Sequence, residues 1–471
     1  MSKILRLLPI IGVIFLFLFL RFYNINDSFF FFNDMGRDMM VLQTWQETGK
    51  PPLLGPQTSA LPFNQSAIYF YLLYPGFLLS KGNPISLVYT LAFIYLFSFL
   101  LGLYLLRKDK PLTKVLLIAF FFISIHPQYI IQGRYVWNPS FVTPFLIISI
   151  ISFYLLLKKF SIPKTILFSA GIATAISISY SVAPLLIIFA LYWLLFSRSN
   201  FKAIALSLFG ALALINLPTI FFELRHRFFL TTALLTKNSP PQKDLAFVDR
   251  LNNLSQYVFS FSNQTLNISL FIASILLCLF LLYKNRQKRK NLQFVASFLY
   301  LGITILAFVT PITIQAHYIF AFTSLLFVII AGLRPLVTVL SLVFFSLNYL
   351  QPTRLKQYFT TASRTTTQME QCFRNYCDSF KEPTFVSVQS SLHPFHNGPE
   401  HRFLLKKAGC NIKDIETQNG QAEYMTVVVD QSTFDQNTNY YELSLLGSHQ
   451  TVRTFPCQNN FYLVLIRKTI P

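Results

Sequence analysis

The sequence predicts a mainly α-helical, polytopic membrane protein with a small α/β domain at its C-terminal end. Of its 471 residues, 53% are hydrophobic and only 12% are charged. Eleven apolar runs are each long enough to cross a bilayer as a helix, which takes about 17 to 25 residues. After residue 350 such runs stop and polar residues increase, so we expect a membrane domain over 1–350 and a soluble domain over 351–471.

The expected spans cover most of the first 350 residues. The first run could be mistaken for a cleavable signal, but no small-residue cleavage site follows it and ten more runs come after it, so we expect it to remain in the protein. The eleven ranges are 4–23, 84–106, 112–130, 139–158, 163–180, 181–198, 202–222, 266–283, 291–309, 314–333 and 335–351.

Basic residues predict the orientation, because loops rich in Lys and Arg tend to stay cytoplasmic. Of the 27 Lys and Arg before residue 351, 17 fall on one side of the predicted membrane, mainly in loops 107–114, 158–164 and 284–290. This places the N-terminus in the cytoplasm and the C-terminal domain outside. The net charge of +21 is therefore a topology signal, and no basic face is left over for nucleic acid.

The first outer loop, 24–83, concentrates the acidic residues of the first half of the chain. Only five Asp or Glu occur before Phe222, and four of them lie here. The apolar stretch 68–79 is too short to span, so we expect a helix lying in the membrane interface. A second short helix is expected over 37–48, and the Pro- and Gly-rich turn 49–56 joins the two. The four acids are Asp27, Asp34, Asp38 and Glu47.

The C-terminal domain shows three strand patterns, 385–388, 424–429 and 461–466, and one helix pattern, 401–408. Its four cysteines could pair in three ways, and their spacing favours disulfides or buried thiols over a zinc site. Cys278, inside a span, is expected to be an apolar filler. The four are Cys372, Cys377, Cys410 and Cys457.

Apart from His126 and His317 near outer ends, the predicted spans are essentially free of acids and bases, which argues against an ion-coupled transporter. Polar residues instead follow several spans on the outer side, in the first loop and in 132–139, 223–227 and 315–318. We expect these four stretches to frame one cavity at the outer face. Its candidate substrate-binding residues are Arg37, Arg134, Tyr135, Glu223, Arg225 and His226.

The arrangement over residues 1–350 resembles a family, the GT-C fold membrane glycosyltransferases, and within it the family 39 or protein-mannosyltransferase-like group that includes aminoarabinose transferases. The resemblance rests on Asp34-Met35-Gly36-Arg37-Asp38 directly after the first span, followed by the turn at Gly49 to Pro56 and a Tyr-rich helix. Members commonly have Asp-Glu-x-x-Tyr there. Met35 departs from that pattern, and this leaves open whether Asp38 takes over the second acid's role.

The resemblance implies an inverting glycosyltransferase of the plasma membrane. It would move a hexosyl or pentosyl group from a polyprenyl-phosphate-linked donor to a glycan, lipid or protein acceptor at the outer face. Asp34 would be the general base and Asp38 would assist. Arg37, Arg134, Arg225 and His226 are candidates for the phosphate, because cations stabilise a departing anion. No cofactor is implied, and the need for a divalent metal ion is left open.

Each candidate also has a structural interpretation. Asp34 and Asp38 could cap the following helix, and Arg37 could pair with either acid as a structural bridge. Arg134 could anchor the chain at the interface, and residues 223–226 could form a local ion cluster. Two other functions stay open: a translocase or transporter of lipid-linked sugars, and a membrane scaffold or receptor that acts through the C-terminal domain.

Overall fold

The computed structural model describes residues 3–58, 64–197, 200–236, 246–310, 315–316, 320–390, 398–418, 420–431, 433–435, 441–458 and 460–469. The chain forms two compact units, and each is discontinuous in sequence. The first comprises Met1–Tyr23, Pro51–Gly76 and Leu87–Phe359; the second comprises Asn24–Lys50, Phe77–Ser86 and Thr360–Pro471. The part of the first loop that carries the acids thus belongs to the same unit as the C-terminal domain.

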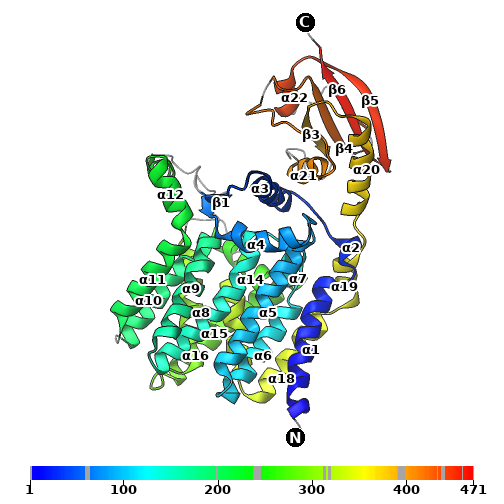
Figure 1. Ribbon diagram of the computed structural model, residues 1–471. Coiled ribbons are helices and arrows are strands. Elements are labelled where there is room, and N and C mark those ends of the chain that lie inside the picture. Colours follow the sequence, from blue (N-terminus) through cyan, green and yellow to red (C-terminus); the bar gives the residue numbers. More distant parts are fainter. Residues whose placement is uncertain are drawn as a thin grey trace. The chain divides into compact units, whose positions relative to one another are not determined.

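The first unit is a helical bundle (Figure 1). Each of the eleven predicted spans contains a helix. Among the described residues, four helices are long and apolar enough to cross a membrane, and three bent pairs raise this to seven. Shorter apolar helices occupy the other four predicted spans. The eleven are α1 (Lys3–Phe22), α5 (Ser86–Leu106), α6 (Lys110–Ile125), α8 (Val142–Lys158), α9 (Ile162–Ile178), α10 (Pro184–Phe196), α11 (Phe201–Ile215), α15 (Gln264–Lys284), α16 (Leu292–Val309), α17 (Phe320–Ala331) and α18 (Pro335–Tyr349).

Three spans that we predicted as single runs have a sharp bend near one end. α6 bends by 66° into α7 (Pro127–Arg134), α11 by 63° into α12 (Leu217–Arg225), and α18 by 56° into α19 (Pro352–Phe359). Each second helix has a proline at its first or second residue. Proline has no N–H to continue the preceding ladder and its ring clashes with the earlier turn, which accounts for the breaks. Two further helices, α13 (Phe229–Thr236) and α14 (Phe247–Phe259), follow α12.

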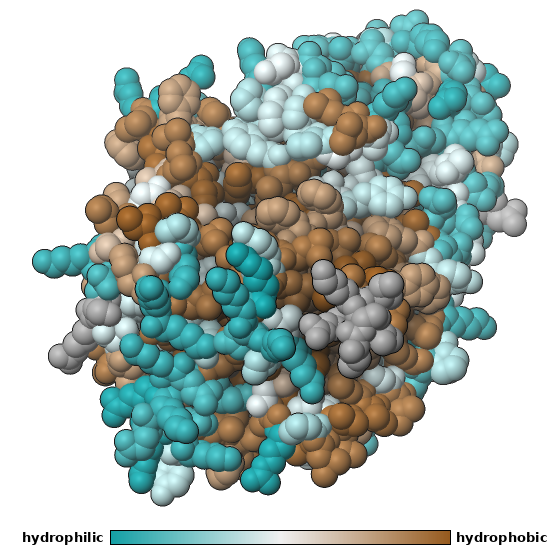
Figure 2. Space-filling view, turned by 60° about the horizontal axis from the view of Figure 1, so that its bottom comes forward, coloured by the Kyte–Doolittle hydropathy of each residue, from teal (hydrophilic) through white to brown (hydrophobic). Residues whose placement is uncertain are grey.

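The surface of the first unit is that of a membrane protein. Large apolar side chains are exposed along α5, α11 and α15, among them Phe93 at 69%, Phe209 at 72% and Leu276 at 60%. A soluble protein rarely leaves so much contiguous apolar surface in water. Figure 2, which brings the lower end of Figure 1 forward, shows hydrophilic residues gathered on one part of that face beside broad hydrophobic areas. Two of the basic loops, 107–114 and 158–164, are joined by a hydrogen bond from Nζ of Lys158 to Oδ2 of Asp109 at 3.0 Å.

The first outer loop contains more regular structure than we predicted. The helix expected over 37–48 begins three residues earlier, as α3 (Asp34–Thr48), and a short α2 (Ile25–Ser28) precedes it. Next comes a two-stranded antiparallel hairpin, β1 (Leu54–Gln57) and β2 (Asn64–Ser66), where we expected a plain linker. The expected short helix is present as α4 (Ile68–Leu79).

The C-terminal part of the second unit is a four-stranded sheet of order β3-β4-β6-β5. β3 (Thr384–Ser390) is parallel to β4 (Tyr424–Asp430), whereas β6 (Phe461–Lys468) is antiparallel to both β4 and β5 (His449–Gln458). The three predicted strands are present, and β5 was missed. Its residues are mostly exposed, so its sequence lacks an apolar alternation. Helices α20 (Thr366–Ser379), α21 (Pro399–Lys407) and α22 (Tyr441–Leu446) complete the unit.

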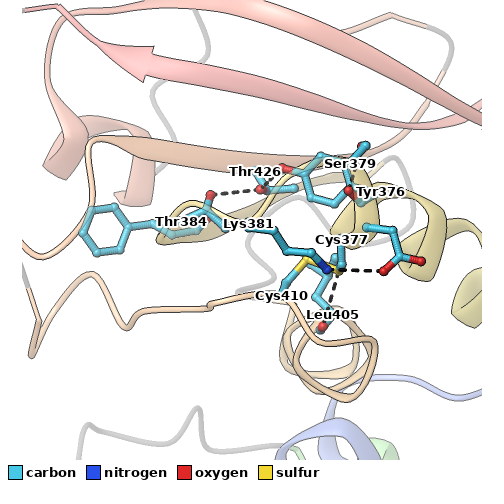
Figure 3. The surroundings of a disulfide bond; sticks show 10 residues. Tyr376, Cys377, Ser379, Lys381, Thr384, Leu405, Cys410 and Thr426 are labelled. Atoms are coloured by element: carbon cyan, nitrogen blue, oxygen red, sulfur yellow. Dashed lines mark hydrogen bonds and ion pairs between the residues drawn. A yellow bond between two sulfur atoms is a disulfide. The ribbon is translucent and has the colours of Figure 1, made fainter.

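Two disulfides fix α20 to the rest of this part. Cys372 pairs with Cys457 of β5, and Cys377 pairs with Cys410, just after α21 (Figure 3). Beside the second bridge, the Tyr376 hydroxyl and the Thr426 hydroxyl lie 2.6 Å apart, which joins α20 to β4. The structure thus selects one of the three pairings left open by the sequence, while Cys278 is a buried free thiol within α15.

Removal of the Cys377–Cys410 bridge is expected to destabilise the second unit strongly. The bridge closes a loop with a sequence separation of 33, for which chain-entropy arguments give about 4 kcal/mol. A C377S/C410S variant should therefore unfold at a clearly lower denaturant concentration than C278S, which removes the free thiol. Non-reducing peptide mapping should recover the 372–457 and 377–410 linkages, and any other pairing contradicts this part of the structure.

Candidate active site

The two acids that follow the first span are held together by one arginine on α3. Nη1 of Arg37 lies 2.5 Å from Oδ1 of Asp34, while its Nε and Nη2 donate to Oδ1 of Asp38 at 2.9 and 2.8 Å. These are charge-assisted hydrogen bonds, about twice as strong as neutral ones. The structure therefore brings Asp34, Arg37 and Asp38 together as a single cluster, and the predicted bridging role of Arg37 is confirmed.

The two carboxylates of this cluster differ in access. The Asp38 side chain is completely buried, whereas Asp34 keeps 23% of its side-chain surface exposed. Among the described residues, Oδ1 of Asp34 is bonded to Arg37 and no partner is found for Oδ2. An ionised carboxylate with one oxygen fixed and the other accessible can accept a proton from a bound hydroxyl. Asp34 is thus the more accessible of the two carboxylates, and Asp38 is the buried one.

The helix periodicity of α3 explains this arrangement. Met35, Met39 and Leu42 form the buried face together with Asp38, at the three- and four-residue spacing of one side of a helix. Asp34 begins the helix, where the partial positive charge of the helix end stabilises a carboxylate. The N-cap residue is Asn33, whose side chain makes no capping bond.

Arg134 and Tyr135 lie in the first unit, at the end of α7. Arg134 is buried, with 7% exposure, and its Nη1 donates to the carbonyls of Arg21 at 2.9 Å and of Tyr23 at 3.2 Å. It therefore binds carbonyls at the C-terminal end of α1. Tyr135 is half-buried and packs edge-on against Trp137, with ring centroids 6.0 Å apart.

Glu223, Arg225 and His226 make local contacts at the bend after α12. The Glu223 carboxylate accepts the backbone N–H groups of Leu230 at 2.8 Å and Thr231 at 3.0 Å, so it caps the start of α13. His226 stacks on Phe222, and Arg225 is exposed. No salt bridge joins these three residues in the described part of the chain, so the expected ion cluster is replaced by a cap. His317, also singled out from the sequence, lies outside the described residues.

The sequence reasoning missed Arg21, which is 2% exposed inside the first predicted span. This corrects the expectation that the spans hold essentially no charge. Its guanidinium donates to the carbonyls of Ser124 at 3.1 Å and Tyr129 at 3.2 Å, on either side of the bend between α6 and α7. The available signal was an arginine in the last turn of the helix, directly after an uncharged run from Leu7 to Leu20.

A second buried polar group lies at the same bend. The hydroxyl of Tyr129 contacts those of Thr323 at 2.7 Å and Ser324 at 3.0 Å on α17. His126 at the bend has its Nε2 3.0 Å from the carbonyl of Val258.

Within the residues that the structure describes, no group of three or more His, Cys, Asp or Glu side chains has a metal-binding arrangement.

Comparison with known proteins identifies the fold. No family model and no curated protein matches the sequence. Two solved structures of ArnT from Cupriavidus metallidurans are similar over nearly their whole length at 10% sequence identity. The structure bound to undecaprenyl phosphate gives a TM-score of 0.62 and covers 100% of this chain and 99% of its own. The apo structure gives 0.63 and covers 98% of each chain.

The chain therefore has the fold of ArnT, an aminoarabinose transferase with a GT-C fold. This confirms the fold that the motif at Asp34 and the span pattern indicated. At 10% identity the similarity carries no residue roles.

Proposed function

We propose that this protein is a membrane glycosyltransferase that moves a sugar from a polyprenyl-phosphate-linked donor to an acceptor at the outer face of the plasma membrane. The single observation that carries the proposal is the cluster at the start of α3, a partly exposed Asp34 held by Arg37 beside the buried Asp38, in a chain with the ArnT fold. The ArnT structure bound to undecaprenyl phosphate supports a carrier of that chemical class.

The proposed reaction is a single displacement. The acceptor hydroxyl oxygen attacks the anomeric carbon, the bond from that carbon to the phosphate oxygen breaks, and the polyprenyl phosphate leaves with the electron pair. The acceptor proton passes to the Asp34 carboxylate. Because a phosphate leaving group needs little protonation, one base suffices, and cations stabilise the departing charge.

For each of the other candidate residues, the contacts that it makes indicate the role that we propose. Arg37 already bonds to two carboxylates, which suits a residue that orients the base. Arg134, Tyr135, Arg225 and His226 remain proposed contacts for donor or acceptor. We assign Glu223 first to capping α13, because its carboxylate oxygens accept the N–H groups of Leu230 and Thr231.

The outer location is supported by the disulfides as well as by the basic loops. Disulfides persist in oxidising compartments, and the C-terminal part carries two. Together with the positive-inside bias, this supports our proposal that α3 and the C-terminal part lie on the extracytoplasmic side and the N-terminus in the cytoplasm.

The direct test is a donor panel. Membranes containing the protein are incubated with undecaprenyl phosphates carrying labelled hexoses or pentoses, and transfer of label out of the donor is measured. We expect at least one donor to be consumed by wild-type membranes and not by membranes without the protein. Movement of intact labelled donor across the bilayer without its consumption would favour the translocase, and no effect on any donor would favour a scaffold.

A further inference from the structure

Asp34 belongs to the segment 24–50 of the second unit. The C-terminal part of the same unit contacts this segment at three places, near its beginning, in its middle and near its end. The N–H of Ala362 donates to the carbonyl of Asp27 at 2.7 Å. Nζ of Lys406 lies 2.6 Å from the carboxylate of Glu47 at the far end of α3. Between these, α3 packs along α21. Residues more than 300 positions apart in sequence thus fix the helix.

The contact in the middle of the segment lies at the N-terminal end of α3. The buried carboxylate of Glu400, 2% exposed, accepts the backbone N–H of Asn33 at 3.1 Å. In a capping box, the residue at the third helical position supplies a Glu or Gln that bonds to the N-cap N–H. In α3 that third position is Gly36. Glu400 therefore supplies from α21 the carboxylate that α3 lacks.

Gly36 also permits the close approach of the two helices. A Cβ atom added there would lie 2.7 Å from the carbonyl carbon of Pro399 and closer still to the backbone of Glu400. These are backbone atoms, so they cannot rotate away as a side chain can. Any larger residue at position 36 must push α3 off α21. Phe31, just before α3, adds an edge-on contact with Phe403 at 5.9 Å.

We propose that α21 sets the position of the Asp34 carboxylate, with Glu400 as the positioning residue and Gly36 as the contact that makes it possible. The C-terminal domain is then part of the catalytic apparatus and more than an attached acceptor-binding module. This inference rests on the proposed role of Asp34. Asp34 directly follows Asn33, so a shift of the Asn33 backbone moves the base itself, and a misplacement of about 1 Å can cost about 10²-fold in rate.

The test compares G36A with G210A in the full-length protein in lipid nanodiscs. Gly210 is also inside a helix, α11, but an added Cβ there meets nothing within 4 Å. The donor is the undecaprenyl phosphate sugar on which the wild type is active. The kcat is normalised to the fraction of molecules that binds undecaprenyl phosphate, so that loss of folded protein does not count. We expect kcat of G36A to fall about 10²-fold with KM for the donor little changed, and G210A to behave as wild type.

Glu400 provides a second, independent pair of variants. E400A removes the acceptor for the Asn33 N–H, while E400Q keeps a carbonyl oxygen in its place. We expect kcat of E400A to fall about tenfold and E400Q to recover most of it, because the Gln carbonyl oxygen still accepts the N–H of Asn33 although the negative charge is gone. This pair decides the question if G36A fails to fold.

The outcomes separate this inference from the proposed function. If D34N is inactive while G36A and E400A both keep wild-type kcat, α21 does not position the base and this inference is wrong. If D34N itself keeps wild-type transfer, the role of Asp34 as base is wrong, and the inference falls with it.

Discussion

The D34N variant should lose about 10³-fold in sugar transfer while it folds and binds undecaprenyl phosphate as the wild type does. General base catalysis contributes about 10² to 10⁴ to a rate, and the amide of Asn cannot accept the proton. Asp34 is 23% exposed and is paired through one oxygen, so its neutral replacement should disturb the fold little. The measurement is initial rate in nanodiscs at saturating donor.

Two variants of nearby acids serve as controls for D34N. Asp27 is exposed in the same segment, so D27N should keep full activity. Asp38 is completely buried against Arg37, so D38N should lower thermal stability as well as rate. Equal losses for D27N and D34N would point to a general effect of charge on the loop and would remove the special role of Asp34.

The R21M variant should lose about 3 to 5 kcal/mol of folding free energy. Arg21 is buried and donates to the carbonyls of Ser124 and Tyr129 at the bend between α6 and α7. Pro127 lacks the N–H that would bond the carbonyl of Ile123 four residues earlier, and Nη2 of Arg21 donates to that carbonyl at 3.4 Å. Each buried carbonyl left without a donor costs about 1 to 3 kcal/mol.

The measurement is equilibrium unfolding in one detergent, with R107M as the matched control. Arg107 is exposed just after α5 and donates to the carbonyl of Tyr104 in the last turn of that helix, so its removal should change little. R21K, which keeps a donor of three N–H groups, should fall between R21M and wild type. If R21M is as stable as R107M, Arg21 does not hold the bend.

The helices were predictable from sequence because each span is a long apolar run, and such runs have few alternatives in a bilayer. The bends were not predictable, because a proline near the end of a run, such as Pro127 or Pro352, is equally typical of a kink within a helix and of the start of a new helix. The exposed strand β5 has no apolar alternation to reveal it.

The site was predictable only in its local part. Asp34 lies three positions before Arg37 and four before Asp38, and these are the spacings at which side chains are neighbours on a helix. The contact of Gly36 with α21 joins positions 36 and 400, and neither segment has a sequence pattern that indicates contact with the other. Similarly, nothing local indicates that Arg21 reaches the carbonyls of Ser124 and Tyr129.

The stereochemistry of the transferred sugar tests the central claim most directly. Wild-type protein would be given the active undecaprenyl phosphate sugar, and the anomeric configuration of the product read by proton NMR. With Asp34 as a general base in a single displacement, the anomeric configuration must be inverted relative to the donor. Retained configuration would exclude a single in-line displacement and would contradict the account.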